Sequence, residues 1–106
     1  MTEPVLDLSE IVGLYKQDAR LSVMRMKAAA QCWDEVIQGG PACLQLRKLA
    51  HQLRGSGRTY GFRDVTRIGK ALELLMVKLQ SKHLKPDQRL QTFVARCLER
   101  LADIFK

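Results

Sequence analysis

Hydrophobic and polar positions along this chain repeat about every 3.6 residues, the period of an α-helix. Alternation with a period of two, which is typical of strands, is nearly absent. The pattern predicts a short lead-in helix over residues 6–14, followed by three long helices over about 14–37, 42–58 and 63–82. A closing helix should follow Lys85-Pro86-Asp87. Amphipathic helices joined by short connections pack into bundles. We therefore expect an all-α fold, an antiparallel four-helix bundle with a short N-terminal lead-in helix.

Glycine and proline mark the expected helix ends. The run Gln38-Gly39-Gly40-Pro41 should stop the second segment, because glycine ends helices and proline begins the next one. Gly61 should separate the third helix from the fourth, and Asp64 should cap the fourth. Pro86 should lie in the first turn of the closing helix.

The apolar stripes predict which faces form the core. The second segment carries a stripe at helical spacing, made of Leu14, Leu21, Met24, Ala28 and Cys32. The third carries another, made of Leu46, Leu49, Ala50, Leu53 and Gly57. A chain of 106 residues can bury one core, so we expect a single domain over residues 1–106.

Composition indicates a soluble cytoplasmic protein. No apolar stretch approaches the roughly 20 residues that a membrane span needs, and Met1-Thr2-Glu3-Pro4 lacks the order of an export signal. The three cysteines are an odd number, are far apart and form no Cys-x-x-Cys, which argues against disulfides and a zinc site. We expect them to be buried thiols, with Cys32 and Cys97 near apolar stripes.

The formal net charge of +7 implies an acidic partner: nucleic acid, anionic lipid or an acidic protein surface. A basic helical nucleic-acid-binding protein therefore remains an alternative. Against it, the paired Asn or Gln residues of a recognition helix are missing, and the basic residues surround a histidine.

That histidine, His51, is the strongest candidate for chemistry. At about 100° per residue it lies about 150° from the centre of the apolar sector of its helix, so it should face away from the core. A lone histidine is more commonly an ordinary surface or core residue, but the neighbours of this one change that interpretation. The same face carries an apolar side chain, four cations and a glycine, namely Leu44, Arg47, Lys48, Arg54, Arg58 and Gly55.

This face suits the storage of a phosphoryl group. Neutral imidazole attacks phosphorus without a separate base, and nearby cations offset the charge of an arriving phosphoryl group. Glycine within a helix costs roughly 1 kcal/mol relative to alanine, and Gly55 leaves a bare spot that another surface could approach. A di-iron bundle would need Glu-x-x-His pairs, but Lys48 and Gln80 precede the two histidines by three residues. We expect no metal site.

Several motifs resemble the histidine-containing phosphotransfer (HPt) domain. They are His51-Gln52-Leu53-Arg54-Gly55-Ser56, then Gly61, then Leu72-Glu73. The family pattern is His-x-x-Lys-Gly-Ser followed by a glycine at that spacing and a Leu-Glu pair in the next helix. The resemblance is close over residues 51–73, and the flanking helices match only in pattern. Arg54 departs from the pattern, because it places a planar guanidinium where the family has a flexible ammonium.

The resemblance implies an antiparallel bundle with His51 as the phosphorylated residue. The protein would accept and donate a phosphoryl group between receiver-domain aspartates of two-component signalling proteins. Arg54 would take the family's lysine position, Gly55 would let the receiver approach, and Glu73 would hydrogen-bond the imidazole. The partner would contact the surrounding face, made of Leu44, Arg47, Lys48 and Arg58.

The resemblance also implies what the protein needs from others. Its partners would be response-regulator receiver domains and the receiver domain of a hybrid sensor kinase. It would be a phosphohistidine carrier without an intrinsic kinase domain, rather than an enzyme. No cofactor is expected, because Mg²⁺ would come with the receiver. We expect a monomer that shuttles freely between separate proteins and binds neither nucleic acid nor membrane.

Overall fold

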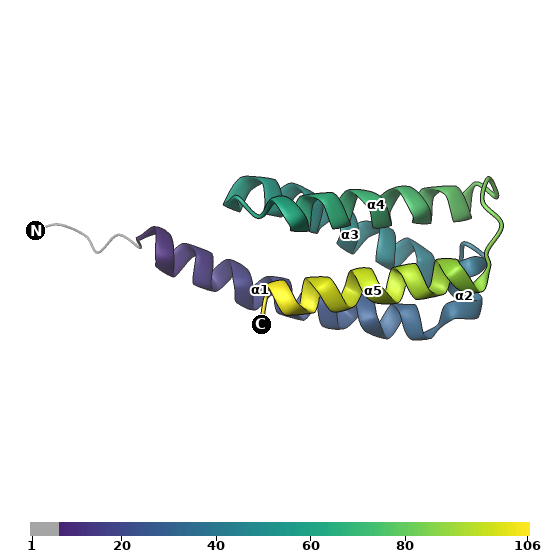
Figure 1. The fold of residues 1–106 in the computed structure, drawn as a ribbon, viewed down its shortest axis with the longest axis horizontal. Helices are drawn as coiled ribbons and strands as arrows, with labels where there is room; N and C mark the ends of the chain where they lie inside the picture. The colour runs from purple at the N-terminus through teal and green to yellow at the C-terminus, as the bar shows by residue number, and fades with distance from the viewer. Residues whose placement is uncertain (1–6) are drawn as a thin grey trace, which may run out of the picture.

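A computed structural model describes residues 7–106, which fold as an antiparallel bundle of helices (Figure 1). The elements are α1 (Leu8–Gln31), α2 (Trp33–Ile37), α3 (Pro41–Tyr60), α4 (Arg63–Gln80) and α5 (Gln88–Ile104). Helices α1, α3, α4 and α5 alternate in direction, and the short α2 turns the chain between α1 and α3. The predicted all-α antiparallel four-helix bundle is confirmed.

The prediction of a separate lead-in helix was wrong. Leu6 lies outside the described residues, and from Leu8 onward α1 runs without a break through the expected boundary near residue 14. Its start is fixed by Asp7, whose carboxylate accepts a hydrogen bond from the backbone N–H of Glu10 at 2.8 Å. Nothing in the sequence between residues 7 and 14 forces a stop, because an isolated glycine such as Gly13 is tolerated in a helix. The N-terminal end of α1 therefore extends beyond the other helices (Figure 1).

The single helix expected over about 14–37 was wrong, because the helix breaks at Cys32 and is divided into α1 and α2. Two other expected helix boundaries are confirmed, and two expected roles at helix starts were wrong. Gly40-Pro41 begins α3, and Gly61 ends it in the left-handed conformation at φ 81°. Asp64 does not cap α4: it lies in the first turn, where its carboxylate pairs with Arg100 of α5 at 3.2 Å. Pro86 lies before α5, because Asp87 is the N-cap and accepts from the N–H of Leu90 at 3.0 Å.

The buried face of α3 is the one predicted, whereas the buried face of α1 is opposite to the predicted one. In α3 the predicted stripe of Leu46, Leu49, Ala50, Leu53 and Gly57 is buried. In α1 the buried residues are Tyr15, Ala19, Val23, Met26 and Ala29. The predicted stripe is exposed: Leu14 by 54%, Leu21 by 53% and Met24 by 65%. Cys32 at its end is also exposed, whereas Cys43 and Cys97 are buried as expected. Helix α1 is apolar on two opposite faces, and large side chains lie on both.

An aromatic cluster closes the bundle at the end from which α1 protrudes. The ring of Tyr15 stacks on Tyr60 with centroids 4.3 Å apart and meets Phe105 edge-on at 5.6 Å. The Ser56 hydroxyl donates to the Tyr15 hydroxyl at 3.0 Å. Aromatic contacts of this kind add to simple area burial, so they fix how α1, α3 and α5 meet.

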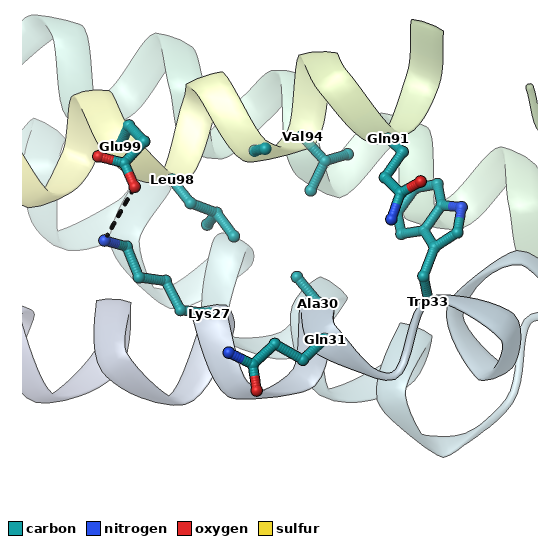
Figure 2. A pocket seen from close by; sticks show the side chains of 9 residues that line it. Lys27, Ala30, Gln31, Trp33, Gln91, Val94, Leu98 and Glu99 are labelled. Carbon is teal, nitrogen blue, oxygen red and sulfur yellow. Dashed lines mark hydrogen bonds and ion pairs between the residues drawn. The ribbon is translucent and has the colours of Figure 1, made fainter. Parts of the chain in front are cut away.

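Toward the opposite end of the bundle, a groove of about 330 Å³ lies between α1 and α5 (Figure 2). Ala30, Val94 and Leu98 line it, and Trp33 stands at one end. The groove lies between α1 and α5, whereas the histidine singled out above belongs to α3. None of the described helices is both long and apolar enough to cross a membrane.

Candidate functional site

The site is built on α3 and α4, which lie unusually close together. A Cβ added at Gly69 of α4 would stand 2.9 Å from the carbonyl oxygen of Ala50 and 2.9 Å from the backbone nitrogen of Arg54, both on α3. No side chain fits between the two backbones here. The bare backbone of Gly69 therefore lets the outer faces of the two helices form one continuous surface.

His51 lies on that surface, as its position on the helical wheel predicted. Its side chain is 70% exposed. Ring atom Nδ1 hydrogen-bonds a carboxylate oxygen, Oε2 of Glu73 on α4. Atom Nε2 makes no hydrogen bond to any part of the chain that the structure describes. One ring nitrogen is thus fixed by the protein, and the other is left for chemistry.

Arg54 completes the contacts of the carboxylate. Its Nη1 donates to Oε1 of Glu73 at 2.6 Å, so the two carboxylate oxygens bind the imidazole and the guanidinium separately. Glu73 is only 16% exposed, whereas the Arg54 side chain remains 45% exposed beside the ring. The Glu73 carboxylate thus positions both the imidazole of His51 and the guanidinium of Arg54. That guanidinium is available to an anion that reaches His51.

Three of the predicted contact residues gather around the ring. Leu44, Arg47 and Lys48 line a shallow hollow of about 570 Å³ together with His51 and Glu73. The same hollow includes Gln52 and Val77, which were not among the predicted contact residues. Val77 follows Glu73 by four residues on α4, so a helical wheel of that helix would have found it.

Gln80 was also missed, and it anchors the edge of the hollow. Its Oε1 accepts from Nη1 of Arg47 at 2.9 Å. It follows Glu73 by seven residues and lies on the same face of α4, two turns along. This contact orients the Arg47 side chain along the seam between the two helices.

Arg58 does not join this hollow. It lines a separate depression at the α3–α4 turn with Gly61, Arg63, Thr66 and Arg67. Gly55, in contrast, behaves as expected: a Cβ added there would meet nothing within 4 Å, so the space beside it is open. Of the four residues predicted to contact a partner, Leu44, Arg47 and Lys48 therefore lie beside His51, whereas Arg58 lies toward the end of the hairpin.

The positive charge of the chain is concentrated on these two helices. Residues 41–80 contain eight Lys or Arg and two acidic residues, Asp64 and Glu73, so eight minus two gives six of the seven net positive charges. One of those two acids already holds His51 and Arg54. This surface therefore favours an acidic partner.

The remaining reactive groups lie elsewhere. Burial raises the pKa of the Cys43 thiol and of the Cys97 thiol, so neither is a ready nucleophile. His83 is exposed in the α4–α5 connection, where its ring meets the Ser81 hydroxyl at 3.1 Å. Within residues 7–106, no three His, Cys, Asp or Glu side chains are grouped as metal ligands would be.

Comparison with known proteins gives one finding. The family model for the Hpt domain matches residues 10–104, which is nearly the whole chain. No curated protein and no solved structure matches at a significant level.

Proposed function

Because the chain belongs to the Hpt domain family, we propose that it is a phosphorelay intermediate that carries a phosphoryl group on His51. Phosphotransfer in two-component signalling is the activity of this family, whose domains are phosphocarriers without a kinase domain of their own. The observation that carries the proposal is the exposed imidazole whose Nδ1 is bound to Glu73.

The geometry supports a specific reaction. With the Nδ1 proton donated to Glu73, the lone pair of Nε2 attacks the phosphorus of an aspartyl phosphate on a receiver domain. A P–N bond forms, the P–O bond to the aspartate breaks, and the receiver recovers a free carboxylate. The ring gains positive charge, which the carboxylate of Glu73 offsets. The same steps in reverse pass the group to the aspartate of a second receiver.

The surroundings of the ring support the rest of the proposal. Arg54 would meet the oxygens of the transferred group, and Gly55 leaves room for the receiver to approach. Leu44 and Val77 offer apolar contacts beside the ring, and Arg47 and Lys48 offer cations. Receiver sites are acidic and bring Mg²⁺ with them, so this surface needs no cofactor of its own. The positive charge, which also suggested a nucleic-acid-binding protein, would in this proposal attract the acidic receiver.

A three-component relay tests the proposal. One receiver domain is phosphorylated with a small phosphoryl donor, freed of the donor, and mixed with this protein and a second receiver. We expect label on the second receiver only when this protein is present, with a transient label on this protein that is labile to acid and stable to alkali. Absence of any label on this protein across a panel of receivers would contradict the proposal.

A further inference from the structure

Helix α1 has a second apolar face that the bundle does not use. Leu14, Leu21 and Met24 are each more than half exposed, and Ala28 is exposed as well. At about 100° per residue these positions centre on the side of the helix opposite to the buried residues. Single exposed leucines are ordinary, but an apolar stripe directly opposite the core is not explained by the fold.

The stripe has the spacing of a helix–helix seam. Together with two glutamines on the same face, its apolar residues alternate three and four residues apart, as Leu14, Gln17, Leu21, Met24, Ala28 and Gln31. This is the a and d spacing of a heptad, which packs side by side with a second helix. From Leu14 to Gln31 the seam spans 18 residues, which corresponds to roughly 26 Å of helix at about 1.5 Å of rise per residue.

We propose that the stripe is covered by the same stripe of a second copy, with the two α1 helices antiparallel about a two-fold axis near residues 21–24. The flanking charges support this arrangement. Asp18 and Arg25 lie on the same flank of the stripe, and the antiparallel alignment brings Asp18 of one copy opposite Arg25 of the other, twice. A parallel alignment would instead bring Arg20 beside Arg25, two like charges.

The other flank does not oppose the arrangement strongly, because its cations already have partners. Arg20 donates from Nε to the backbone carbonyl of Phe105. Lys27 pairs with Glu99 of α5 at 3.3 Å, the contact drawn as a dashed line in Figure 2. Lys27 is neutralised within its own chain, and Arg20 is held against the carbonyl of Phe105, so the repulsion across this flank is reduced.

The dimer would leave the phosphotransfer site free. Helix α1 contacts α3 and α5 through its buried face, and the stripe lies on its other side. His51 faces outward from the α3–α4 surface, so both copies remain open to a receiver. One helix per copy buries less than the roughly 800 Å² per partner of a standard interface, so the dimer should be weak, with a dissociation constant of about 10–100 μM. In this proposal a weak dimer replaces the monomer expected from the sequence.

Sedimentation equilibrium of the full chain, between about 5 μM and 500 μM, tests whether the chain dimerises, and it needs no phosphoryl donor. We expect the mass to rise with concentration from 12.1 kDa toward twice that value. Leu21→Lys should stay at the mass of one chain. The matched control is Leu74→Lys, because Leu74 of α4 is 54% exposed and Leu21 is 53% exposed. A single-chain mass throughout for the unchanged protein, or association that survives Leu21→Lys, would overturn the proposal.

Charge exchange tests the antiparallel alignment. Asp18→Arg and Arg25→Asp should each weaken association roughly three- to tenfold, because each places like charges opposite one another. The double variant restores opposite charges across the axis, so association should return to that of the unchanged chain. If the double variant is as weak as the single ones, the alignment is wrong. Because the readout is mass, it is independent of whether His51 carries phosphate.

Discussion

The imidazole of His51 on α3 is held through Nδ1 by the carboxylate of Glu73 on α4. Two helices therefore fix one ring, and the direction of its free nitrogen depends on both. In the proposed function the consequence is chemical as well as structural, since a fixed Nδ1 would leave Nε2 to take the phosphoryl group.

Glu73→Ala should slow phosphoryl transfer roughly tenfold, because it removes the group that orients the ring and offsets its charge. Phosphorus–nitrogen coupling in the NMR spectrum of the phosphorylated protein should show phosphate on Nε2 in the unchanged chain. The control is Glu99→Ala, which removes the same charge from α5 and should leave the rate unchanged. Phosphate on Nδ1 in the unchanged chain would rule out the role given to Glu73.

Gly55→Ala should separate stability from function. The added methyl group meets nothing within 4 Å, and alanine favours a helix over glycine, so stability should rise by about 0.5–1 kcal/mol. Transfer from a receiver should nevertheless slow, because the methyl group occupies the open surface beside His51. Urea unfolding and a transfer assay on the same sample measure both effects. An unchanged transfer rate would show that the receiver does not approach over this glycine.

The matched control for Gly55→Ala is Gly69→Ala, which makes the same substitution on α4. Here the methyl group would stand 2.9 Å from backbone atoms of Ala50 and Arg54, which cannot move aside cheaply. We expect a loss of stability of about 1–3 kcal/mol, measured by urea unfolding. Equal stability of the two variants would contradict the close approach of α3 and α4.

The thiols should differ sharply in reactivity. Cys32 is exposed, whereas burial raises the pKa of Cys43 and Cys97 and so lowers their thiolate fractions. A thiol reagent at neutral pH should label the native chain rapidly at Cys32 alone, and all three cysteines after unfolding. Peptide mapping identifies the labelled residue. Rapid native labelling of Cys43 would mean that the interior opens more readily than this packing implies.

Sequence patterns predicted α3, α4 and α5 closely, because each has one dominant apolar face and because Gly61 marks the boundary between α3 and α4. They failed on α1, which has apolar residues on both faces. Periodicity identifies a stripe but does not show which of two stripes is buried, and Leu14, Leu21 and Met24 form a stripe as regular as the buried one. The buried face mixes Tyr15, Val23 and Met26 with two alanines, Ala19 and Ala29, whose small size suits close packing but gives a weak hydrophobic signal.

The site was predicted in parts. The exposure of His51 and the presence of Leu44, Arg47 and Lys48 near it followed from one helical wheel, since all four share a helix. Glu73 belongs to a different helix, and its place came only from the family resemblance. Its contact with Arg54, and the contact of Gln80 with Arg47, depend on the register between α3 and α4. That register is set by the close approach at Gly69, which no periodicity within a single helix encodes.

The most direct test of the central claim compares the two histidines of the chain. His51→Gln and His83→Gln each remove one exposed imidazole, and both variants should keep the helical circular dichroism of the unchanged protein. Incubated with a phosphorylated receiver, His83→Gln should acquire acid-labile phosphate as the unchanged chain does, and His51→Gln should acquire none. Labelled His51→Gln, or loss of label in His83→Gln, would contradict the assignment of His51 as the phosphoryl carrier.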